Sequence, residues 1–128
     1  MSKNTEIIDA FVAAWGRRDL QGILDYFTDD ALYINIPMDP PNEGKEAIQK
    51  ALEGFIGMAN EIEFVVHHQG ETPDGRVLNE RTDRFKIGDS WVELPVMEIF
   101  ELRGEKICGW RDYFDVGMFQ SQMPGAES

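Results

Sequence analysis

Apolar residues recur at helical spacing in two parts of the chain. From Glu6 to Trp15 and from Lys45 to Ala59 they form one stripe each, which predicts two amphipathic helices, the first ending near Gly16. Asp19 predicts the N-cap of a short helix between them, because an aspartate side chain accepts hydrogen bonds from the free N–H groups of a first turn. The polar cluster at residues 28–30 is expected to end that short helix.

The remaining segments have the period-two pattern of strands. Alternating residues predict a strand over 31–38, followed by a loop at 39–44, where two prolines fix φ and remove backbone donors. Three turn signals come later in the chain: Pro73-Asp74-Gly75, Gly88-Asp89 and Arg103-Gly104-Glu105-Lys106. They predict a strand that begins after residue 60 and three more over 76–87, 91–102 and 107–114. The tail from Gln120 to Ser128 is expected to be frayed or bound to a partner.

The order of helices first and strands afterwards indicates one α+β domain over residues 1–128, with no repeat and no linker. We expect a curved antiparallel (mixed) sheet that packs on the N-terminal helices and folds over them into a cone. The interior of such a cone is a pocket for a small molecule.

Composition excludes several classes of partner. The 128 residues include 12 Lys and Arg against 24 Asp and Glu, a formal net charge of −12. Nucleic acid and anionic membranes bind clustered basic residues, so neither is expected as a partner. Cys108 is the single cysteine and cannot form an intramolecular disulfide, and no apolar run approaches the roughly 20 residues that span a bilayer. Without a signal-peptide core at residues 1–6, the cytoplasm is the default location.

Charged residues fall on apolar strand faces at two places. In the run 77–87, period two puts Arg81 and Asp83 on the same face as Val77, Phe85 and Ile87. In the last strand, the residues that share a face are Cys108, Trp110, Asp112 and Phe114. The pattern therefore predicts three ionisable groups inside the domain.

Buried charges are costly unless they are paired, and the fork of Arg81 can reach both Asp83 and Asp112. Two aspartates in one apolar pocket cannot both ionise freely, so the pKa of one rises and an acid stands beside a base. Tyr33 and Asn35, on one side of the first strand, can hold a water against the basic carboxylate. A structural ion-pair network, or strand faces assigned wrongly, explains the charges equally well, and Tyr33 and Asn35 can simply bind backbone.

These residues resemble the limonene-1,2-epoxide hydrolase family, part of the NTF2-like and ketosteroid-isomerase-like fold group that includes SnoaL-like proteins. The segments that carry the resemblance are ALYINIP with Tyr33 and Asn35, NERTDRF with Arg81 and Asp83, and GWRDYFD with Asp112. Singly each pair is a weak signal, whereas the five positions in order are fairly specific.

The resemblance implies hydration of an epoxide to a vicinal diol in one step, without a covalent intermediate and without a metal or other cofactor. Asp112 would be the general base, Tyr33 and Asn35 would hold its water, Asp83 would protonate the epoxide oxygen, and Arg81 would bridge the two aspartates. It also implies a homodimer through the outer face of the sheet, to which Trp91, Met97 and Ile99 are candidate contributors. The expected substrate is a small hydrophobic, cyclic or terpenoid-like epoxide.

Three further features concern the pocket. Glu98 departs from the small or apolar residue expected there. If buried, it would narrow the cavity or add a competing acid, but a slip of the strand face at Pro95 is the favoured explanation. His67 and His68 lack a Cys or His partner at ligand spacing, so a metal site is not expected. Candidate lining residues, each equally explained as core, are Leu32, Phe55, Val66, Leu78, Phe85, Leu94, Met97, Ile99, Trp110 and Phe114.

Two other functions compete with hydration. An isomerase or cyclase of the same fold would use one carboxylate base with an oxyanion site, which a bridging arginine fits less well. A ligand-binding module without turnover would use the same cone, and its affinity would survive the loss of Asp112.

Overall fold

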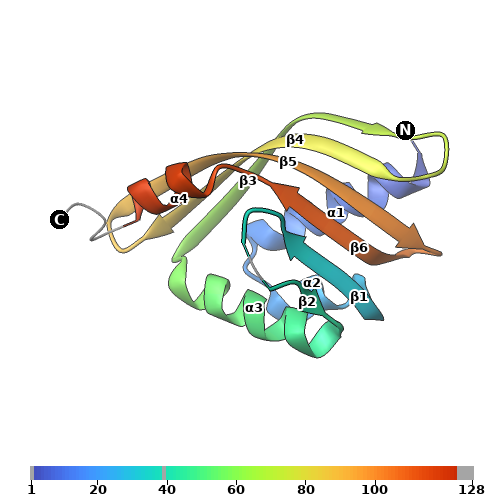
Figure 1. Cartoon of the computed structure of the whole chain (residues 1–128), viewed down its shortest axis with the longest axis horizontal. Coiled ribbons are helices and arrows are strands. Elements are labelled where there is room, and N and C mark those ends of the chain that lie inside the picture. The colour runs from blue at the N-terminus through green and yellow to red at the C-terminus, as the bar shows by residue number, and fades with distance from the viewer. Residues whose placement is uncertain (1, 39, 124–128) are drawn as a thin grey trace.

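Helices and a mixed sheet form the two layers of the structure, a computed structural model that describes residues 2–38 and 40–123 (Figure 1). The elements follow the order α1 (Lys3–Gly16), α2 (Leu20–Leu24), β1 (Phe27–Asn35), β2 (Asn42–Glu43), α3 (Lys45–Met58), β3 (Glu61–Glu71), β4 (Val77–Ile87), β5 (Ser90–Arg103), β6 (Lys106–Tyr113) and α4 (Val116–Gln122). The predicted helices, turns and late strands are therefore confirmed, most within a few residues of the expected bounds.

The sheet has six strands in the order β2-β1-β6-β5-β4-β3. Strands β3 to β6 form the predicted antiparallel meander, and β1 adds to it by pairing in parallel with β6. Figure 1 shows the long strands curving, with α1, α2 and α3 on one side of the sheet. The sheet is thus mixed and open, and its concave side faces the helices.

Local side chains set the helix starts. Ser2 caps α1 and forms a capping box with Thr5, which moves the start ahead of the predicted Glu6. Asp19 caps α2 as predicted, because its Oδ1 accepts from the N–H of Gly22 at 3.0 Å.

Two predicted boundaries around the first strand are wrong. Residues 28–30 lie within β1, which begins at Phe27 and ends at Asn35. The register between β1 and β6 shifts between Phe27 and Leu32, and the polar residues 28–30 lie within this irregular part of the strand. The predicted loop after β1 contains the short strand β2, paired antiparallel with β1.

The expectation of a frayed tail is also wrong for its first part. Residues 120–122 belong to α4, whose N-cap Asp115 accepts from the backbone N–H groups of Gly117 and Met118. The Gln122 side chain holds this helix on β5, donating to the Glu93 carbonyl at 2.8 Å and accepting from its N–H at 2.9 Å. Residues 124–128 lie outside the described part of the chain.

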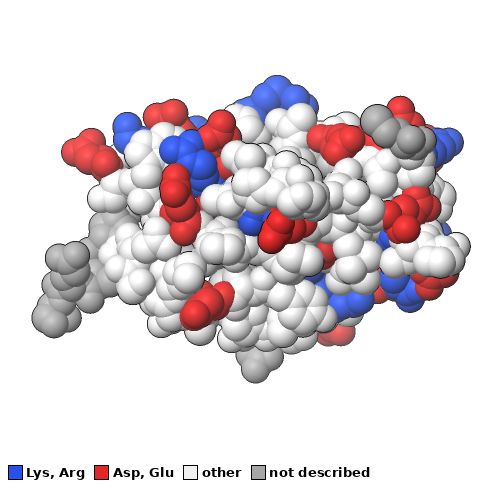
Figure 2. All heavy atoms as spheres, turned by 90° about the horizontal axis from the view of Figure 1, so that it is seen from above, with Lys and Arg blue, Asp and Glu red and all other residues white. Residues whose placement is uncertain are grey.

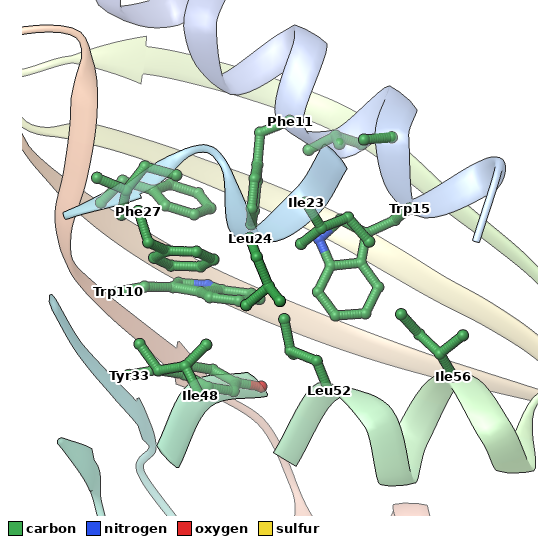
Figure 3. Close-up of a cluster of buried hydrophobic side chains, with 14 of the residues drawn as sticks. Phe11, Trp15, Ile23, Leu24, Phe27, Tyr33, Ile48, Leu52, Ile56 and Trp110 are labelled. Atoms are coloured by element: carbon green, nitrogen blue, oxygen red, sulfur yellow. The ribbon is translucent and has the colours of Figure 1, made fainter. Parts of the chain in front are cut away.

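An aromatic cluster fills the space between helices and sheet (Figure 3). The ring of Phe11 on α1 meets Trp110 edge-on at 5.2 Å, and Trp110 stacks on Tyr33 at 4.1 Å between ring centroids. Such contacts fix large side chains in defined orientations. The core thus sets the position of Tyr33 and Trp110 at the inner edge of the cavity described below.

On the face shown in Figure 2, acidic and basic side chains are interspersed. Among the described residues, no helix is both long enough and apolar enough to cross a membrane.

Candidate active site

The predicted inward-facing charges of β4 and β6 are buried. Arg81 is 1% exposed, Asp83 8% and Asp112 5%. On β4 they follow the period of two, since Val77 and Phe85 share their face, while Ile87 at the strand end is only half-buried. The alternative that these groups lie in solvent is therefore wrong.

Arg81 is bound most closely to Asp83. Its Nε donates to Asp83 Oδ1 at 2.5 Å and its Nη2 to Oδ2 at 3.0 Å, a two-point contact that fits the planar fork of a guanidinium. The guanidinium lies 4.2 Å from the ring centroid of Phe64. Arg81 Nη2 comes only to 4.0 Å from Asp112 Oδ2, too far for a hydrogen bond, so of the two contacts predicted for its fork only the one with Asp83 forms.

Glu98 is a third buried carboxylate of the site, and the expected slip at Pro95 does not occur. The β4–β5 register runs unbroken through Pro95, and Glu98 is 2% exposed on the inner face. Its Oε1 accepts from Arg81 Nη1 at 2.6 Å, a contact that the sequence interpretation assigned to Asp112. Its Oε2 accepts from Trp110 Nε1 at 3.1 Å.

Asp112 is held mainly by Trp110, whose Nε1 donates to its Oδ1 at 2.5 Å. The grouping of Cys108 with these residues is wrong. A bulge between Glu101 and Leu102 shifts the β5–β6 register, so Ile107 is buried and Cys108 is only half-buried.

Tyr33 and Asn35 bring a hydroxyl and an amide to the same place. Tyr33 donates its hydroxyl to Asn35 Oδ1 at 3.1 Å, and Asn35 is the β1–β6 register partner of Asp112. Burial, and next the charge of Asp112, hold the pKa of Tyr33 well above its usual value, so the phenol stays protonated. The parallel pairing of β1 with β6 therefore places both side chains beside Asp112.

Burial disfavours ionisation of both aspartates. It raises the pKa of Asp83 to about 6 against the opposing effect of Arg81. It also raises the pKa of Asp112 well above its usual value, and the charge of Glu98 is the next cause. Arg81 brings one positive charge against three carboxyl groups, and those charges raise its own pKa although burial opposes this. The cluster is therefore built to retain a proton near neutral pH.

All five predicted site residues line one cavity of about 200 Å³. Of the candidate lining residues, Phe55, Phe85, Leu94, Trp110 and Phe114 do line it. Leu32, Val66 and Leu78 are not part of the wall, and Met97 and Ile99 alternate to the outer side of β5. The walls also contain side chains that sequence reasoning did not single out, namely Trp15, Met38, Ala51, Leu52, Phe64, Val96 and Phe119.

The sequence interpretation considered a buried Glu98 but preferred a strand slip, and that preference is wrong. Helix α4 supplies a contributor that was not expected, Phe119. The signal for Glu98 was present, because it alternates in phase with the apolar residues Val92, Leu94 and Phe100. For Phe119 the signal was Asp115, a capping residue directly before the helix that carries Phe119.

Three comparisons relate this chain to known proteins. The family model described as limonene-1,2-epoxide hydrolase catalytic domain matches residues 2–124. Epoxide hydrolase EphG of Mycobacterium tuberculosis is 32% identical over 122 residues, which cover 92% of this chain and 78% of that protein. The solved structure of an LEH-like epoxide hydrolase of M. tuberculosis has a TM-score of 0.82 at 30% identity, covering 96% of this chain and 91% of that one.

A more distant likeness concerns the fold alone. The epoxide hydrolase/cyclase-like enzyme SalBIII, described for pyran ring formation in the polyether salinomycin, has a TM-score of 0.81 at 19% identity, covering 90% of this chain and 92% of that one. The α+β architecture is thus the NTF2-like and SnoaL-like one that was predicted.

Proposed function

The chain belongs to the limonene-1,2-epoxide hydrolase family, and we propose that it adds water in one step to a small hydrophobic epoxide, giving a vicinal diol. It is an epoxide hydrolase of this type, for which an epoxide and water are the substrates. The observation that supports the one-step mechanism best is the convergence of Tyr33, Asn35, Arg81, Asp83 and Asp112 on one cavity.

Asp112 is the proposed general base. A water held by Tyr33 and Asn35 would lie against its carboxylate, because Asn35 is its partner across the β1–β6 pair. As Asp112 takes a proton, the water oxygen attacks one epoxide carbon and the C–O bond of the ring breaks.

Asp83 is the proposed general acid. It gives its proton to the epoxide oxygen as the ring opens, so that no free alkoxide forms in an apolar site. Arg81 then stabilises the Asp83 carboxylate through its two hydrogen bonds. Each product hydroxyl has its proton, and the proton taken up by Asp112 returns to Asp83 for the next cycle.

The reactive form therefore needs its proton on Asp83 and an ionised Asp112. Burial raises the pKa of both groups, and that of Asp83, about 6, leaves part of it protonated at neutral pH. A bound water favours the ionised form of Asp112 because it donates a hydrogen bond to the carboxylate.

The walls of the cavity favour a compact, apolar substrate. Its volume of about 200 Å³ lies below the roughly 300–1,000 Å³ of typical sites for drug-sized ligands. Aromatic side chains form much of the wall, among them Trp15, Phe55 and Phe85. A cyclic or terpenoid-like epoxide fits these properties, and all the proposed roles are filled by protein side chains without a cofactor.

Product analysis tests the proposal. The purified protein is incubated with a panel of cyclic and aryl epoxides in ¹⁸O-labelled water, and the products are identified by mass spectrometry. Hydration gives a diol that carries one labelled oxygen, whereas an isomerase or cyclase would release product without label. A protein that binds the epoxides but makes no diol would refute the proposed reaction.

A homodimer and a cytoplasmic location are further parts of the proposal. Trp91 and Met97 are exposed by 39% and 48% on the outer face of β5, a surface that a second copy could cover. Light scattering on the purified protein tests the dimer, and cell fractionation tests the location.

A further inference from the structure

Glu98 is a buried carboxylate to which the proposed reaction gives no role. Its side chain has no exposed surface, and it is not among the residues that line the cavity. In the described part of the chain its hydrogen bonds come from Arg81 and Trp110, one to each carboxyl oxygen. The contact with Arg81 Nη1, at 2.6 Å, is an ion pair with a buried guanidinium.

Glu98 also lies directly opposite Asp112 in the β5–β6 register. A single N–H, that of Trp110, points at both carboxyl groups, 2.5 Å from Asp112 Oδ1 and 3.1 Å from Glu98 Oε2. Like charges on directly opposed strand residues are unfavourable, and the buried site weakens solvent screening. The charge of Glu98 therefore opposes ionisation of Asp112.

Among the residues that the structure describes, three other ionisable groups face this pair. Arg81 and Asp83 come from β4 and Tyr33 comes from β1. Arg81 favours an ionised Asp112 but lies 4.0 Å from it, while it contacts Glu98 at 2.6 Å. Glu98 thus takes up a guanidinium nitrogen that would otherwise be available to the base.

We propose that Glu98 is a positioning residue of the hydration reaction: as a fixed counter-ion of Arg81 and the cross-strand neighbour of Asp112, it makes Asp112 a stronger base. The inference rests on the proposed function, in which Asp112 deprotonates water. A base is most effective when its pKa lies close to the working pH, and an ordinary aspartate lies well below neutrality. Glu98 supplies part of the increase in the pKa of Asp112 that such a base requires.

The pH dependence of kcat/KM in Glu98→Gln tests this role. Activity is lost as the pH falls through the pKa of Asp112, and removal of a neighbouring negative charge lowers that pKa. In the variant, the acid limb of the pH profile, the range where kcat/KM falls as the pH is lowered, should move to lower pH by about one unit or more. The plateau value of kcat should fall, with little change in KM, because Glu98 does not line the cavity.

Two matched variants complete the test. Glu98→Asp keeps the charge, so its acid limb should stay near that of the wild type. Glu93→Gln removes an equivalent charge from the outer face of the same strand, where exposed Glu93 pairs with half-buried Arg84, and should change neither kcat nor the acid limb. Glu98→Met is a second uncharged variant, in case the glutamine variant does not fold.

An acid limb that stays in place in both uncharged variants, with only stability or plateau rate reduced, would show that Glu98 is merely structural. Failure of the proposed function looks different, because the wild type would then yield no diol. In that event the ¹³C carboxyl resonance of Asp112 gives the same comparison without turnover. It should titrate at lower pH in Glu98→Gln than in the wild type, and equal titration curves would overturn the inference.

Discussion

Arg81 holds Asp83 through two hydrogen bonds, Nε to Oδ1 at 2.5 Å and Nη2 to Oδ2 at 3.0 Å, yet it comes no closer than 4.0 Å to Asp112. The two aspartates of the site are therefore not equivalent. Asp83 is fixed and its ionised form is stabilised by a guanidinium, as suits an acid that must release its proton. Asp112 lines the same cavity as Tyr33 and Asn35, as suits a base that must hold a water.

Asp112→Asn should abolish diol formation and leave the fold intact. An amide of the same shape cannot take a proton from water, and general-base help is worth about 10²–10⁴-fold in rate. Steady-state kinetics and thermal unfolding of the variant check both parts. Full activity in a folded Asp112→Asn protein would contradict the assignment of the base.

Arg81→Lys should lower kcat by at least about tenfold, because a single ammonium cannot make the two-point contact with Asp83 that aligns and stabilises that acid. It should also destabilise the protein, since Glu98 loses its guanidinium partner in a buried site. Arg84→Lys is the matched control, because Arg84 lies on the same strand but pairs with exposed Glu63 and Glu93. Equal effects of the two substitutions would argue against a specific role for Arg81.

Tyr33→Phe should reduce kcat by about 10- to 100-fold while stability changes by no more than about 1.5 kcal/mol. The phenylalanine ring keeps the stacking on Trp110 but cannot donate to Asn35 or to a bound water. Kinetics together with denaturant unfolding separate the two effects. If the rate were unchanged, the hydroxyl would have no part in holding the water.

The free energy of unfolding should fall as the pH rises, and ionisation of Asp83 should account for part of this fall. The pKa of Asp83 is about 6 in the folded protein against an ordinary 3.8, so the folded state binds the proton more tightly. The tighter proton binding by Asp83 stabilises the folded protein by about 3 kcal/mol. This stabilisation is fully present at pH values below 3.8 and is lost as the pH rises through about 6.

Asp83→Asn removes this contribution, since asparagine does not titrate. The free energy of unfolding of the variant should decline less than that of the wild type between pH 4 and pH 7, and the difference should approach about 3 kcal/mol. Denaturant titrations across this range make the comparison. Parallel curves for the two proteins would mean that Asp83 is not held in its protonated form by the fold.

The inward-facing charges could be predicted from the sequence because period two alone decides the face of a strand residue. Arg81 and Asp83 alternate with Thr82 and Arg84, and one face of β4 carries Val77 and Phe85. The same rule would have placed Glu98 inside. The expectation of a slip at Pro95 was wrong. Strand β6 pairs with β5 only from Met97 onward, so Pro95 lies where that edge of β5 has no neighbouring strand. There the N–H that proline lacks is not needed for a hydrogen bond between strands.

Long-range pairings could not be predicted in the same way. The parallel pairing of β1 with β6 puts Asn35 opposite Asp112, although 76 positions separate the two residues in the chain. Nothing local encodes this contact, and the bulge that displaces Cys108 depends on how β5 and β6 pair. Helix α4 was missed because it is short, contains a glycine and has no apolar repeat.

A single turnover in ¹⁸O-labelled water tests direct addition of water most directly. Enzyme is mixed in excess over a cyclic epoxide that it converts, and the diol and the protein are analysed by mass spectrometry after one turnover. If Asp112 activates water, the first diol formed carries the label and the protein carries none. An unlabelled first diol, with ¹⁸O appearing in an aspartate, would mean that a carboxylate attacks the epoxide and would contradict the one-step mechanism.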